Sequence, residues 1–534
     1  MIDDRMPCAG RDPTPTVDAR WPVRTLLSDI DETALVRLGE IIALKLRSGD
    51  VVALVGDLGA GKSTLARAMI RALLDDPAAE VASPTFPLML TYETPRLVVR
   101  HCDFYRLGDP GEVDEIGFDE ALVEGAAIVE WPERAWAALP HDRLQIEIGP
   151  SEKGDDLRRV LLKASGAPAV RLDRIVRIDR FLAASQMQSH AGDARITYLQ
   201  GDASPRAYAR LERPDGSSAI LMDAPPMPDG PPVEGGLPYS RIAHLAEDVA
   251  PFVEIARHLA AVDLSVPAIL ADDLADGLLL IEDLGDLTFA RALASGASQE
   301  TLWQAALDPL TRLTGTPPPA HLAVYDTRAL TIECRLVLDW MWPALHGSPP
   351  TETVRRAFAD AWHPSIDRVA GRPEGIVIRD YHSPNLMWLP DREAHRRVGI
   401  LDFQDAVAGP PAYDVVSLLQ DARLDVAADL ERALLDRHIA GLAASGRLAD
   451  SHAFRADYAI LGAQRAAKIL GIFVRLSRRD GKHGYLAHLP RISDYLERNL
   501  AHPALADVRR WFDVHLPAAA RGALAKPASE WRSP

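Results

Sequence analysis

Two separate stretches of the sequence carry residue types that could handle phosphate. The first, "GDLGAGKST" at 56–64, joins three glycines to a lysine and two hydroxyls: Gly56, Gly59, Gly61, Lys62, Ser63 and Thr64. An apolar run precedes it and a helical pattern follows it, so backbone N–H groups and a helix N-terminus can surround phosphate oxygens. The lysine would reach the β/γ oxygens and Ser63 would hold Mg²⁺. This stretch predicts a site for ATP and Mg²⁺.

Three polar residues downstream could complete this site. "SPTF" at 83–86 offers Thr85 as a hydroxyl that could sense the γ-phosphate, "HCDFYRL" at 101–107 offers Asp103, and "IVEWPE" at 128–133 offers Glu130. Both acids follow strand-like runs, and carboxylates at such strand ends lie on the ligand-bearing edge of a parallel sheet. There they could ligate Mg²⁺ or orient the attacking water. Taken singly, each could equally be a surface residue.

The second stretch, "RDYHSPN" at 379–385, has the spacing that kinases use for phosphoryl transfer. Asp380 and Asn385 are separated by four residues, and "LDFQDA" places Asp402 seventeen residues after Asn385. A hairpin between them would return Asp402 to the same mouth. Asp380 would then be the base or orienting group, with Asn385 and Asp402 on the metal. An Asx-turn or a cap explains one such residue, but three at the correct spacing favour the catalytic interpretation.

The nucleotide contacts of this second site are less clear from the sequence. "LLLIEDLGD" at 278–286 suits a hinge near Glu282 whose backbone would bind adenine, but no lysine occurs between Lys163 and Lys468 to pair with the phosphates. Arg206 or Arg210 could supply that charge, because guanidinium binds phosphate in a bidentate manner. Solvated strand arginines are the equally balanced alternative. Arg465 and Lys468 could reach a sugar carboxylate, although pairing with nearby acids is favoured.

Composition and length limit the class of protein. The chain has 534 residues, 47% hydrophobic and 25% charged, which is typical of a soluble globular protein with two to four domains. No run approaches the roughly 20 apolar residues of a membrane helix. The N-terminus lacks the apolar segment of a secretory signal, and three cysteines without metal-ligand spacing disfavour disulfides and zinc. We therefore expect a cytoplasmic protein without membrane association.

The pattern of apolar runs predicts two folded regions and the helix that joins them. Residues 21–166 alternate strands with helices, which indicates an α/β P-loop domain with a mainly parallel sheet and a terminal hairpin. A linker helix is expected at 167–189. Residues 190–515 begin with antiparallel strands and continue as helices, which indicates an α+β, two-lobed, protein-kinase-like domain. The ends, 1–20 and 516–534, are expected to be flexible tails.

The negative charge concentrates in the first region. Residues 1–150 hold 15 basic and 26 acidic side chains, a net −11 of the total −17. Such a surface repels nucleic-acid phosphates, so any role in RNA chemistry would act through a protein partner. A role in solubility alone is equally consistent with the charge.

The motifs of the first region, "GDLGAGKST", "SPTF", "DFYRL" and "VEWPE", resemble in this order the TsaE family. The resemblance covers nearly all of 25–166. It implies an ATPase that docks on TsaB and TsaD and supports N6-threonylcarbamoyladenosine formation at position 37 of tRNA, with tRNA met only through the complex. It also implies that Lys62, Ser63 and Thr85 hold nucleotide and metal, that Asp103 joins the metal shell, and that Glu130 binds metal or positions water.

The second region resembles the anomeric amino-sugar kinases, AmgK, of the aminoglycoside-phosphotransferase-like superfamily. The resemblance rests on "GDASPRAY", "LMDAPP", "EDLG", "RDYHSPNLMWL", "LDFQDAVAGPPAYDVVSLLQD" and "QRAAKILGIFVRLSRRDGK". It implies phosphorylation of the C1 hydroxyl of N-acetylmuramate or N-acetylglucosamine in cell-wall recycling. The missing lysine then looks like a trait of this subgroup. The alternatives are a pseudokinase that regulates the ATPase, or a kinase of another alcohol such as an aminoglycoside.

Overall fold

The computed structural model describes residues 21, 23–84, 87–185, 195–199 and 206–523 of the chain. Contacts divide the chain into two compact units. The N-terminal unit comprises Met1–Asp223 with Leu278–Leu280, and the C-terminal unit comprises Ala224–Gly277 with Ile281–Pro534. The predicted domain boundary at residue 190 falls inside the N-terminal unit, and as a boundary between families it stays a prediction.

The N-terminal unit is built on a seven-stranded sheet of order β1-β7-β6-β2-β5-β4-β3. Its strands are β1 (Val23–Ile30), β2 (Val51–Val55), β3 (Met89–Glu93), β4 (Val98–Asp103), β5 (Gly125–Glu130), β6 (Leu144–Ser151) and β7 (Gly154–Ala164). Only β6, β2, β5 and β4 run parallel, whereas β1, β7 and β3 pair antiparallel at the two sides. The expected parallel sheet is therefore its centre, and β5 is buried at every position, as a strand covered on both faces must be.

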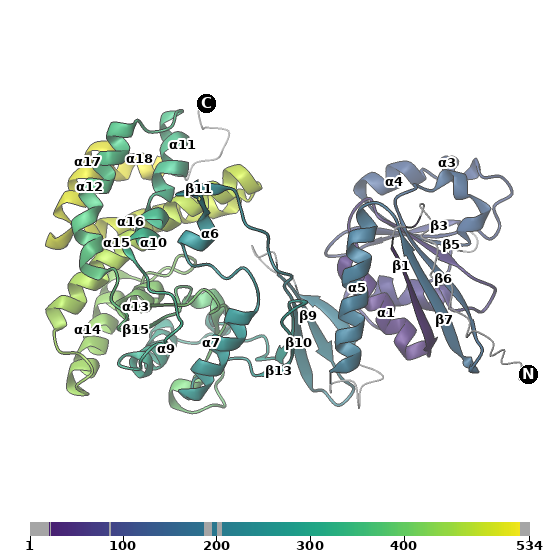
Figure 1. The fold of residues 1–534 in the computed structure, drawn as a ribbon, viewed down its shortest axis with the longest axis horizontal. Helices are drawn as coiled ribbons and strands as arrows, with labels where there is room; N and C mark the ends of the chain where they lie inside the picture. The colour runs from purple at the N-terminus through teal and green to yellow at the C-terminus, as the bar shows by residue number, and fades with distance from the viewer. Residues whose placement is uncertain (1–20, 22, 85–86, 186–194, 200–205, 524–534) are drawn as a thin grey trace, which may run out of the picture. The chain divides into compact units, whose positions relative to one another are not determined.

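Helices cover this sheet and position its phosphate loop. They are α1 (Glu32–Lys45), α2 (Lys62–Leu74), α3 (Glu112–Glu115), α4 (Phe118–Glu124) and α5 (Ala167–Ala184). α1 packs along α2, and α5 packs against α1, β1 and β7 (Figure 1). The linker helix predicted at 167–189 is thus an integral layer of the unit as far as Ala184, and its last predicted residues, from 186, lie outside the described part.

A second, five-stranded sheet has the order β13-β14-β10-β9-β8. Its strands are β8 (Arg195–Leu199), β9 (Ala207–Glu212), β10 (Ser218–Asp223), β13 (Ile269–Asp273) and β14 (Leu278–Glu282). The expected antiparallel strands are confirmed, since β8, β9 and β10 pair antiparallel, and a turn at Asp215-Gly216 joins β9 to β10, with Gly216 at φ +81°.

Polar contacts hold β8–β10 to the rest of the N-terminal unit. The carboxylate of Asp223, 4% exposed, accepts a hydrogen bond of 2.7 Å from Nε of Arg174 on α5 and pairs with Lys45 on α1. The backbone N–H of Ile196 donates to Oε2 of Glu40 at 3.2 Å. The first strands of the second sheet are therefore fixed to the helices that flank the first.

The C-terminal unit is mainly helical. Its helices of six or more residues are α7 (Ala250–Ala261), α8 (Phe289–Ala294), α9 (Gln299–Leu313), α10 (Thr327–Cys334), α12 (Glu352–Val369), α13 (Ala412–Leu419), α14 (Ala428–Ala444), α15 (Ser451–Asp480), α16 (Leu489–Leu500), α17 (Ala506–His515) and α18 (Ala518–Ala523). Short strands form three antiparallel pairs: β11 (Pro232–Glu234) with β12 (Leu237–Pro238), β15 (Gly375–Val377) with β18 (Val407–Gly409), and β16 (Leu386–Trp388) with β17 (Val398–Ile400). The 30-residue α15 packs against α10, α12, α13 and α16. None of the described helices is both long and apolar enough to cross a membrane.

The expectation that a flexible tail begins at residue 516 is wrong for its first part. Helix α18 follows, and its Arg521 is fully buried. The guanidinium pairs with Glu497 and donates from Nε to Oγ of Ser493 at 3.0 Å. The Pro/Ala-rich composition concealed this anchor, because a single buried arginine leaves no periodic apolar pattern.

The buried imidazole of His438 on α14 makes stability depend on pH. His438 is 5% exposed, and burial lowers its pKa to about 4. A histidine in the unfolded chain has a pKa near 6.5. Between pH 6.5 and pH 4, this histidine is therefore protonated in the unfolded chain and neutral in the folded chain. The stability that this group contributes above pH 6.5 is therefore lost as the pH falls toward 4. Between pH 7 and pH 5 the loss should be about 2 kcal/mol.

Urea unfolding of the wild type and of His438→Gln at both pH values measures this contribution. The variant should lose about 2 kcal/mol less than the wild type on acidification. The exposed His321→Gln, whose side chain is 63% exposed, should behave like the wild type. Equal losses in the wild type and His438→Gln would contradict the prediction.

Candidate active sites

The phosphate loop of the N-terminal unit needs glycine at two places. Gly56 has φ +154°, and a Cβ there would lie 2.5 Å from the carbonyl oxygen of Ile148. Gly61, at φ +114°, precedes α2 directly, and a Cβ there would lie 2.9 Å from the side chain of Leu35. Only glycine tolerates such conformations and such close approach. The loop is therefore shaped to turn its backbone toward a ligand at the start of α2.

Lys62 is held inside this loop. Its Nζ donates to the carbonyl oxygens of Gly56 at 2.6 Å and Asp57 at 2.9 Å, and lies 3.7 Å from the ring centroid of Trp131. Burial lowers the pKa of Lys62, while the carboxylate of Glu130 opposes that shift. Thr64, half-buried, lies in the first turn of α2.

The two predicted acids meet beside Ser63. Its Oγ donates to Oε2 of Glu130 at 2.7 Å, and the other oxygen, Oε1, lies 2.9 Å from Nε2 of His101. Asp103 is in register with Glu130 on the parallel pair β4–β5 and accepts from the backbone N–H of Tyr105 at 3.0 Å. A hydroxyl and two carboxylates are the oxygen ligands that Mg²⁺ prefers, so these residues fit the ion. Thr85 lies outside the described residues.

Two contacts in this site were not expected from the sequence. His101 was not singled out, although it lies two residues before Asp103 and therefore faces the same side of β4. Trp131 packs against the core beneath β4 and β5, and its ring also covers the Lys62 ammonium. Trp131 has φ +56°, a conformation that costs energy in a non-glycine residue. Its position directly after Glu130 was the available signal.

In the C-terminal unit the hairpin β16–β17 brings the ends of the second motif together. Leu386 is in register with Ile400, so Asn385 and Asp402 flank the same end of the hairpin. Nδ2 of Asn385 donates to the carbonyl oxygen of Asp380 at 3.0 Å and lies 3.4 Å from Oδ2 of Asp402. The side-chain oxygen of Asn385 and the carboxylate of Asp402 are oxygen ligands of the kind that Mg²⁺ prefers, so these residues fit the ion.

The loop that carries Asp380 is fixed by two buried carboxylates, while Asp380 itself stays 42% exposed in its side chain. Asp414 accepts from the backbone N–H of Ile378 at 2.7 Å and of Arg379 at 2.9 Å. Asp421 accepts from the backbone N–H of Ser383 at 2.7 Å. Burial raises the pKa of Asp414 to about 7, against the two N–H donors. The Asp380 carboxylate therefore stays accessible on a loop whose backbone is held by buried acids.

The Arg379 side chain, unlike the exposed side chain of Asp380, lies in a buried cluster of charged residues. Its guanidinium pairs with Glu333, which is 0% exposed and also accepts from Nζ of Lys468 at 2.8 Å and from Gln464 at 3.1 Å. Lys468 and Arg379 hold the pKa of Glu333 at about 2 despite its burial. The favoured interpretation of Lys468 as the partner of an acid is thus confirmed. The backbone of Arg379 has a positive φ of +72°.

The remaining predicted residues come from other elements of the chain. Glu282 ends β14, accepts from the backbone N–H of Ala268 at 3.1 Å and pairs with Arg392 at 2.8 Å. Arg206 precedes β9 and Arg210 lies within it, both half-buried. Arg465 donates to the carbonyl oxygen of Gln420 at 3.2 Å. The roles of Glu282, Arg206 and Arg210 in nucleotide binding stay predictions.

Sequence reasoning missed several residues that build the second site. Nε2 of His382 lies 4.0 Å from Oδ1 of Asp380, and Gln404 donates to Asp402 at 2.9 Å. Both lie within the motifs themselves, so their position was a usable signal. Asp414 and Asp421 lie seven residues apart in "YDVVSLLQD", the first within α13 and the second two residues after its end. Glu333 had no local signal.

The fold and these two sites define the class. A phosphate loop with strand-end acids is the nucleotide site of a P-loop ATPase, and the arrangement of Asp380, Asn385 and Asp402 in a helical unit is that of a kinase-like phosphotransferase. The family model described as "Threonylcarbamoyl adenosine biosynthesis protein TsaE" matches residues 30–160, and the one described as "Phosphotransferase enzyme family" matches residues 195–454. The chain belongs to both families, as a fusion of a TsaE domain with a member of the N-acetylmuramate/N-acetylglucosamine kinases.

Each part of the chain aligns with most of the length of individual relatives. An N-acetylmuramate/N-acetylglucosamine kinase of Caulobacter vibrioides is 41% identical over 62% of this chain and 94% of its own length. The protein of the same name from Pseudomonas aeruginosa is 34% identical over 59% of this chain and 87% of its own. A tRNA threonylcarbamoyladenosine biosynthesis protein TsaE of Rickettsia bellii is 34% identical over 23% of this chain and 85% of its own.

Replacing Glu333 should destabilise the C-terminal unit strongly. Glu333→Gln leaves the charges of Arg379 and Lys468 buried without a counter-charge, which costs about 3–5 kcal/mol when a buried ion pair is broken. We expect a much lower thermal midpoint, measured by circular dichroism. The double variant Glu333→Gln/Lys468→Met should regain part of the loss, because it removes one of the unpaired cations.

The exposed Glu393→Gln is the matched control, since it removes an acid of the same unit from the surface. If Glu333→Gln melted at the temperature of this control, the charge cluster would not stabilise the unit.

Proposed function

We propose that this chain is a bifunctional enzyme. Its N-terminal unit would hydrolyse ATP in support of tRNA N6-threonylcarbamoyladenosine formation, as the name of its relatives from Rickettsia indicates. The observation that carries the ATPase part is the contact of 2.7 Å between Ser63 and Glu130 next to a buried Lys62. These are the groups that a phosphate loop needs for a triphosphate with its Mg²⁺.

In this proposal each residue has a defined task in ATP hydrolysis. Lys62 exchanges its two carbonyl contacts for β- and γ-phosphate oxygens, and the backbone N–H groups from Gly59 to Thr64 surround the phosphates. Ser63, Asp103 and Glu130 hold Mg²⁺, which balances the negative charge of the phosphates when it is bound. Glu130, oriented by His101 at 2.9 Å, also positions the attacking water. Thr85 would contact the γ-phosphate.

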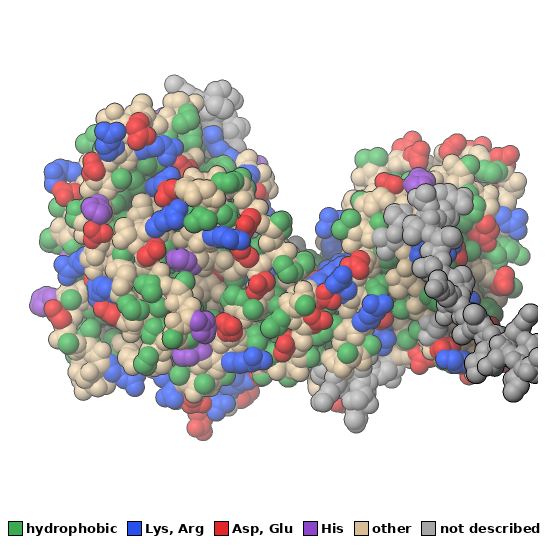
Figure 2. Space-filling view, viewed as in Figure 1, with side chains coloured by type: hydrophobic (Ala, Val, Ile, Leu, Met, Phe, Trp, Pro, Cys, Tyr) green, Lys and Arg blue, Asp and Glu red, His purple; other side chains and the backbone are tan. Residues whose placement is uncertain are grey.

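Proteins like TsaB and TsaD are the proposed partners of this unit, with tRNA contacted only through them. Exposed acids line α3 and α4 on its surface: Asp114, Glu115, Asp119, Glu120 and Glu124. Figure 2 shows red side chains gathered over the part of the N-terminal unit where Figure 1 labels these helices. Such a surface repels RNA phosphates, which supports contact through a protein instead.

Lys62→Ala should abolish the ATPase activity, because it removes the charge that faces the β- and γ-phosphates. Loss of one such preorganised group typically costs about 10²–10³-fold in rate. Phosphate release from the purified full-length protein with its TsaB- and TsaD-like partners measures this rate. The variant should also fail to restore tRNA modification in cells that lack TsaE.

Lys153→Ala is the control, because its side chain is 73% exposed on the same unit. Restoration of modification by Lys62→Ala to the level of this control would refute the ATPase assignment.

The C-terminal unit would phosphorylate an amino sugar. Its relatives are N-acetylmuramate/N-acetylglucosamine kinases, and the C1 hydroxyl of either sugar is the proposed acceptor, within cell-wall recycling. The observation that carries this proposal is the meeting of Asp380, Asn385 and Asp402 at one end of the β16–β17 hairpin. The relatives do not favour the alternatives of a pseudokinase or an aminoglycoside kinase.

In this proposal each of these residues has a task in phosphoryl transfer. Asp380, whose carboxylate is the exposed member, accepts the proton of the sugar hydroxyl while the sugar oxygen bonds to the γ-phosphorus. The bond from that phosphorus to the β-phosphate oxygen breaks, and ADP leaves. Asn385 and Asp402 hold the Mg²⁺ that accompanies ATP. Backbone near Glu282 would bind adenine, and Arg206 and Arg210 would replace the missing lysine at the phosphates.

Asp380→Asn should remove sugar 1-phosphate formation while the protein still binds nucleotide. General-base catalysis typically contributes about 10²–10⁴-fold, so turnover should fall by that factor. Phosphorus NMR of products formed from ATP with a panel of amino sugars and aminoglycosides measures both the rate and the acceptor. Asp391→Asn, an exposed acid of the same hairpin region, is the control. Unchanged turnover in Asp380→Asn would remove this residue from the mechanism.

A further inference from the structure

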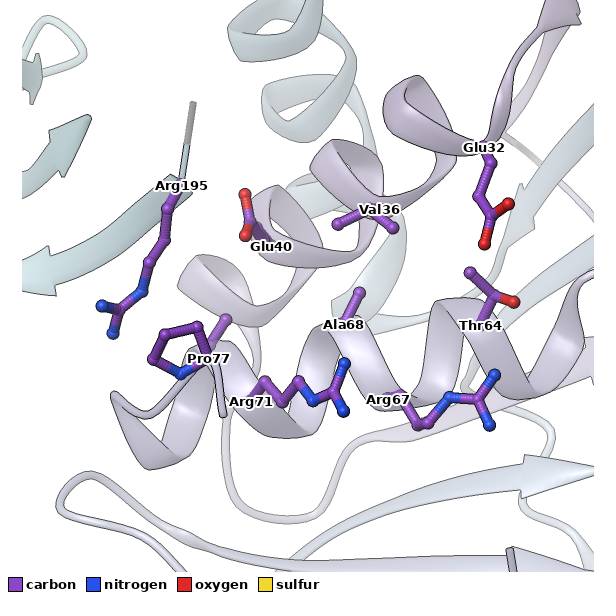
Figure 3. A pocket seen from close by; sticks show the side chains of 10 residues that line it. Glu32, Val36, Glu40, Thr64, Arg67, Ala68, Arg71, Pro77 and Arg195 are labelled. Atoms are coloured by element: carbon purple, nitrogen blue, oxygen red, sulfur yellow. The ribbon is translucent and has the colours of Figure 1, made fainter. Parts of the chain in front are cut away.

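A polar groove of about 250 Å³ lies in the N-terminal unit between α1 and α2, and neither activity uses it as a whole. Its charged and hydroxyl-bearing walls are Glu32, Glu40, Thr64, Arg67, Arg71 and Arg195. Figure 3 shows the two acids along α1, the two arginines along α2, and Arg195 on β8 at the end nearest Glu40. The groove therefore runs from the start of the phosphate-loop helix to the first strand of the phosphotransferase segment.

The cations of the groove keep donors available. Within the described part of the chain, Arg67 makes no hydrogen bond or ion pair, and Arg71 donates only through Nε, to the carbonyl oxygen of Ala79 at 3.1 Å. The guanidinium groups lie one helical turn apart on α2, so both can bond one anion. Arg195 is already paired with Asp75 at 2.7 Å. Two neighbouring guanidinium forks with free donors are a site for phosphate or carboxylate.

The acids make the groove unsuited to a bare anion. Glu40 accepts a hydrogen bond from the backbone N–H of Ile196, and burial raises its pKa to about 7. It can therefore both donate and accept hydrogen bonds near neutral pH. Glu32, in the first turn of α1, adds a second carboxylate. Carboxyl groups beside a phosphate site are suited to sugar hydroxyls, which donate and accept in the same way.

We propose that this groove binds the phosphate ester of a monosaccharide, with the phosphate on Arg67 and Arg71 and the sugar hydroxyls on Glu32 and Glu40. Its volume lies just below the usual range of small-molecule sites, which leaves room for a single sugar ring with its phosphate. The choice of a sugar phosphate rests on the proposed kinase function, whose product belongs to that class. Arg195 comes from the segment matched by the phosphotransferase family, so the closed end of the groove requires the fusion.

The position of the groove connects it to the ATPase site. Thr64, Arg67 and Arg71 lie on one face of α2, the helix that begins with Lys62 and Ser63. A ligand between α1 and α2 therefore restrains the helix that presents the phosphate-binding groups. Through this contact the product of one unit would be sensed by the other.

Hydrogen exchange of the full-length protein tests this site where it lies. The probe is N-acetylglucosamine 1-phosphate, added while a non-hydrolysable ATP analogue occupies the nucleotide sites. We expect saturable slowing of exchange in the amides of α1 and α2. Arg67→Gln/Arg71→Gln should weaken this effect at least tenfold in probe concentration, and Arg67→Gln alone should weaken it without any loss of folding contacts. Arg159→Gln, an exposed arginine of β7, should leave it unchanged.

Three results would overturn the proposal. If millimolar probe did not slow hydrogen exchange in α1 and α2, the groove would not bind the probe. Equal slowing by inorganic phosphate at the same concentration would show that the groove does not recognise the sugar. Equal slowing by N-acetylglucosamine would show that it does not recognise the phosphate. Because the probe is supplied, these results do not depend on kinase activity. Binding with no sugar 1-phosphate formed in the NMR assay would refute the kinase function and leave the groove intact.

Discussion

A charged group buried away from water needs a hydrogen-bonding or oppositely charged partner, and both candidate active sites depend on this constraint. Glu130, 2% exposed, accepts a hydrogen bond from the Ser63 hydroxyl and contacts the ring of His101, so two partners fix the position of its carboxyl group. Glu333, fully buried, pairs with Arg379 and Lys468. In the first site the partnered acid is itself the proposed ligand of metal or water. In the second site the partnered acid holds the residue next to Asp380.

This difference follows from how each loop obtains its backbone shape. The phosphate loop uses glycines, which reach positive φ at little cost, so it needs few outside contacts. In the kinase-like site, Arg379 in the loop after β15 has φ +72°, and Asp402 after β17 has φ +56°. A non-glycine residue keeps such a conformation only when the surrounding structure enforces it. The N–H bonds to Asp414 and the burial of Arg379 against Glu333 provide that enforcement.

The same difference explains what the sequence could predict. The phosphate loop, its strands and the β16–β17 hairpin were predictable because their determinants are local: glycine spacing, apolar runs and a fixed interval between Asp380, Asn385 and Asp402. Glu333 lies 46 residues before Arg379, and its other two partners, Gln464 and Lys468, come from α15, still further along the chain. The antiparallel pairing of β1 with β7 and the anchoring of Arg521 are likewise contacts between distant segments. No local pattern encodes them, because tertiary packing alone brings the partners together.

The same need to pair a buried charge links the two fused segments at Asp223. It ends β10, in the phosphotransferase segment, whereas its partners Lys45 and Arg174 belong to the ATPase segment and the helix after it. Separating the two segments would leave an acid and two cations largely buried and unpaired, at a cost of about 3–5 kcal/mol for a broken buried pair. β10 is therefore part of the N-terminal unit. The ion pair of Asp223 with Lys45 ties the end of β10 to α1, and α1 packs along the helix that starts at the phosphate loop.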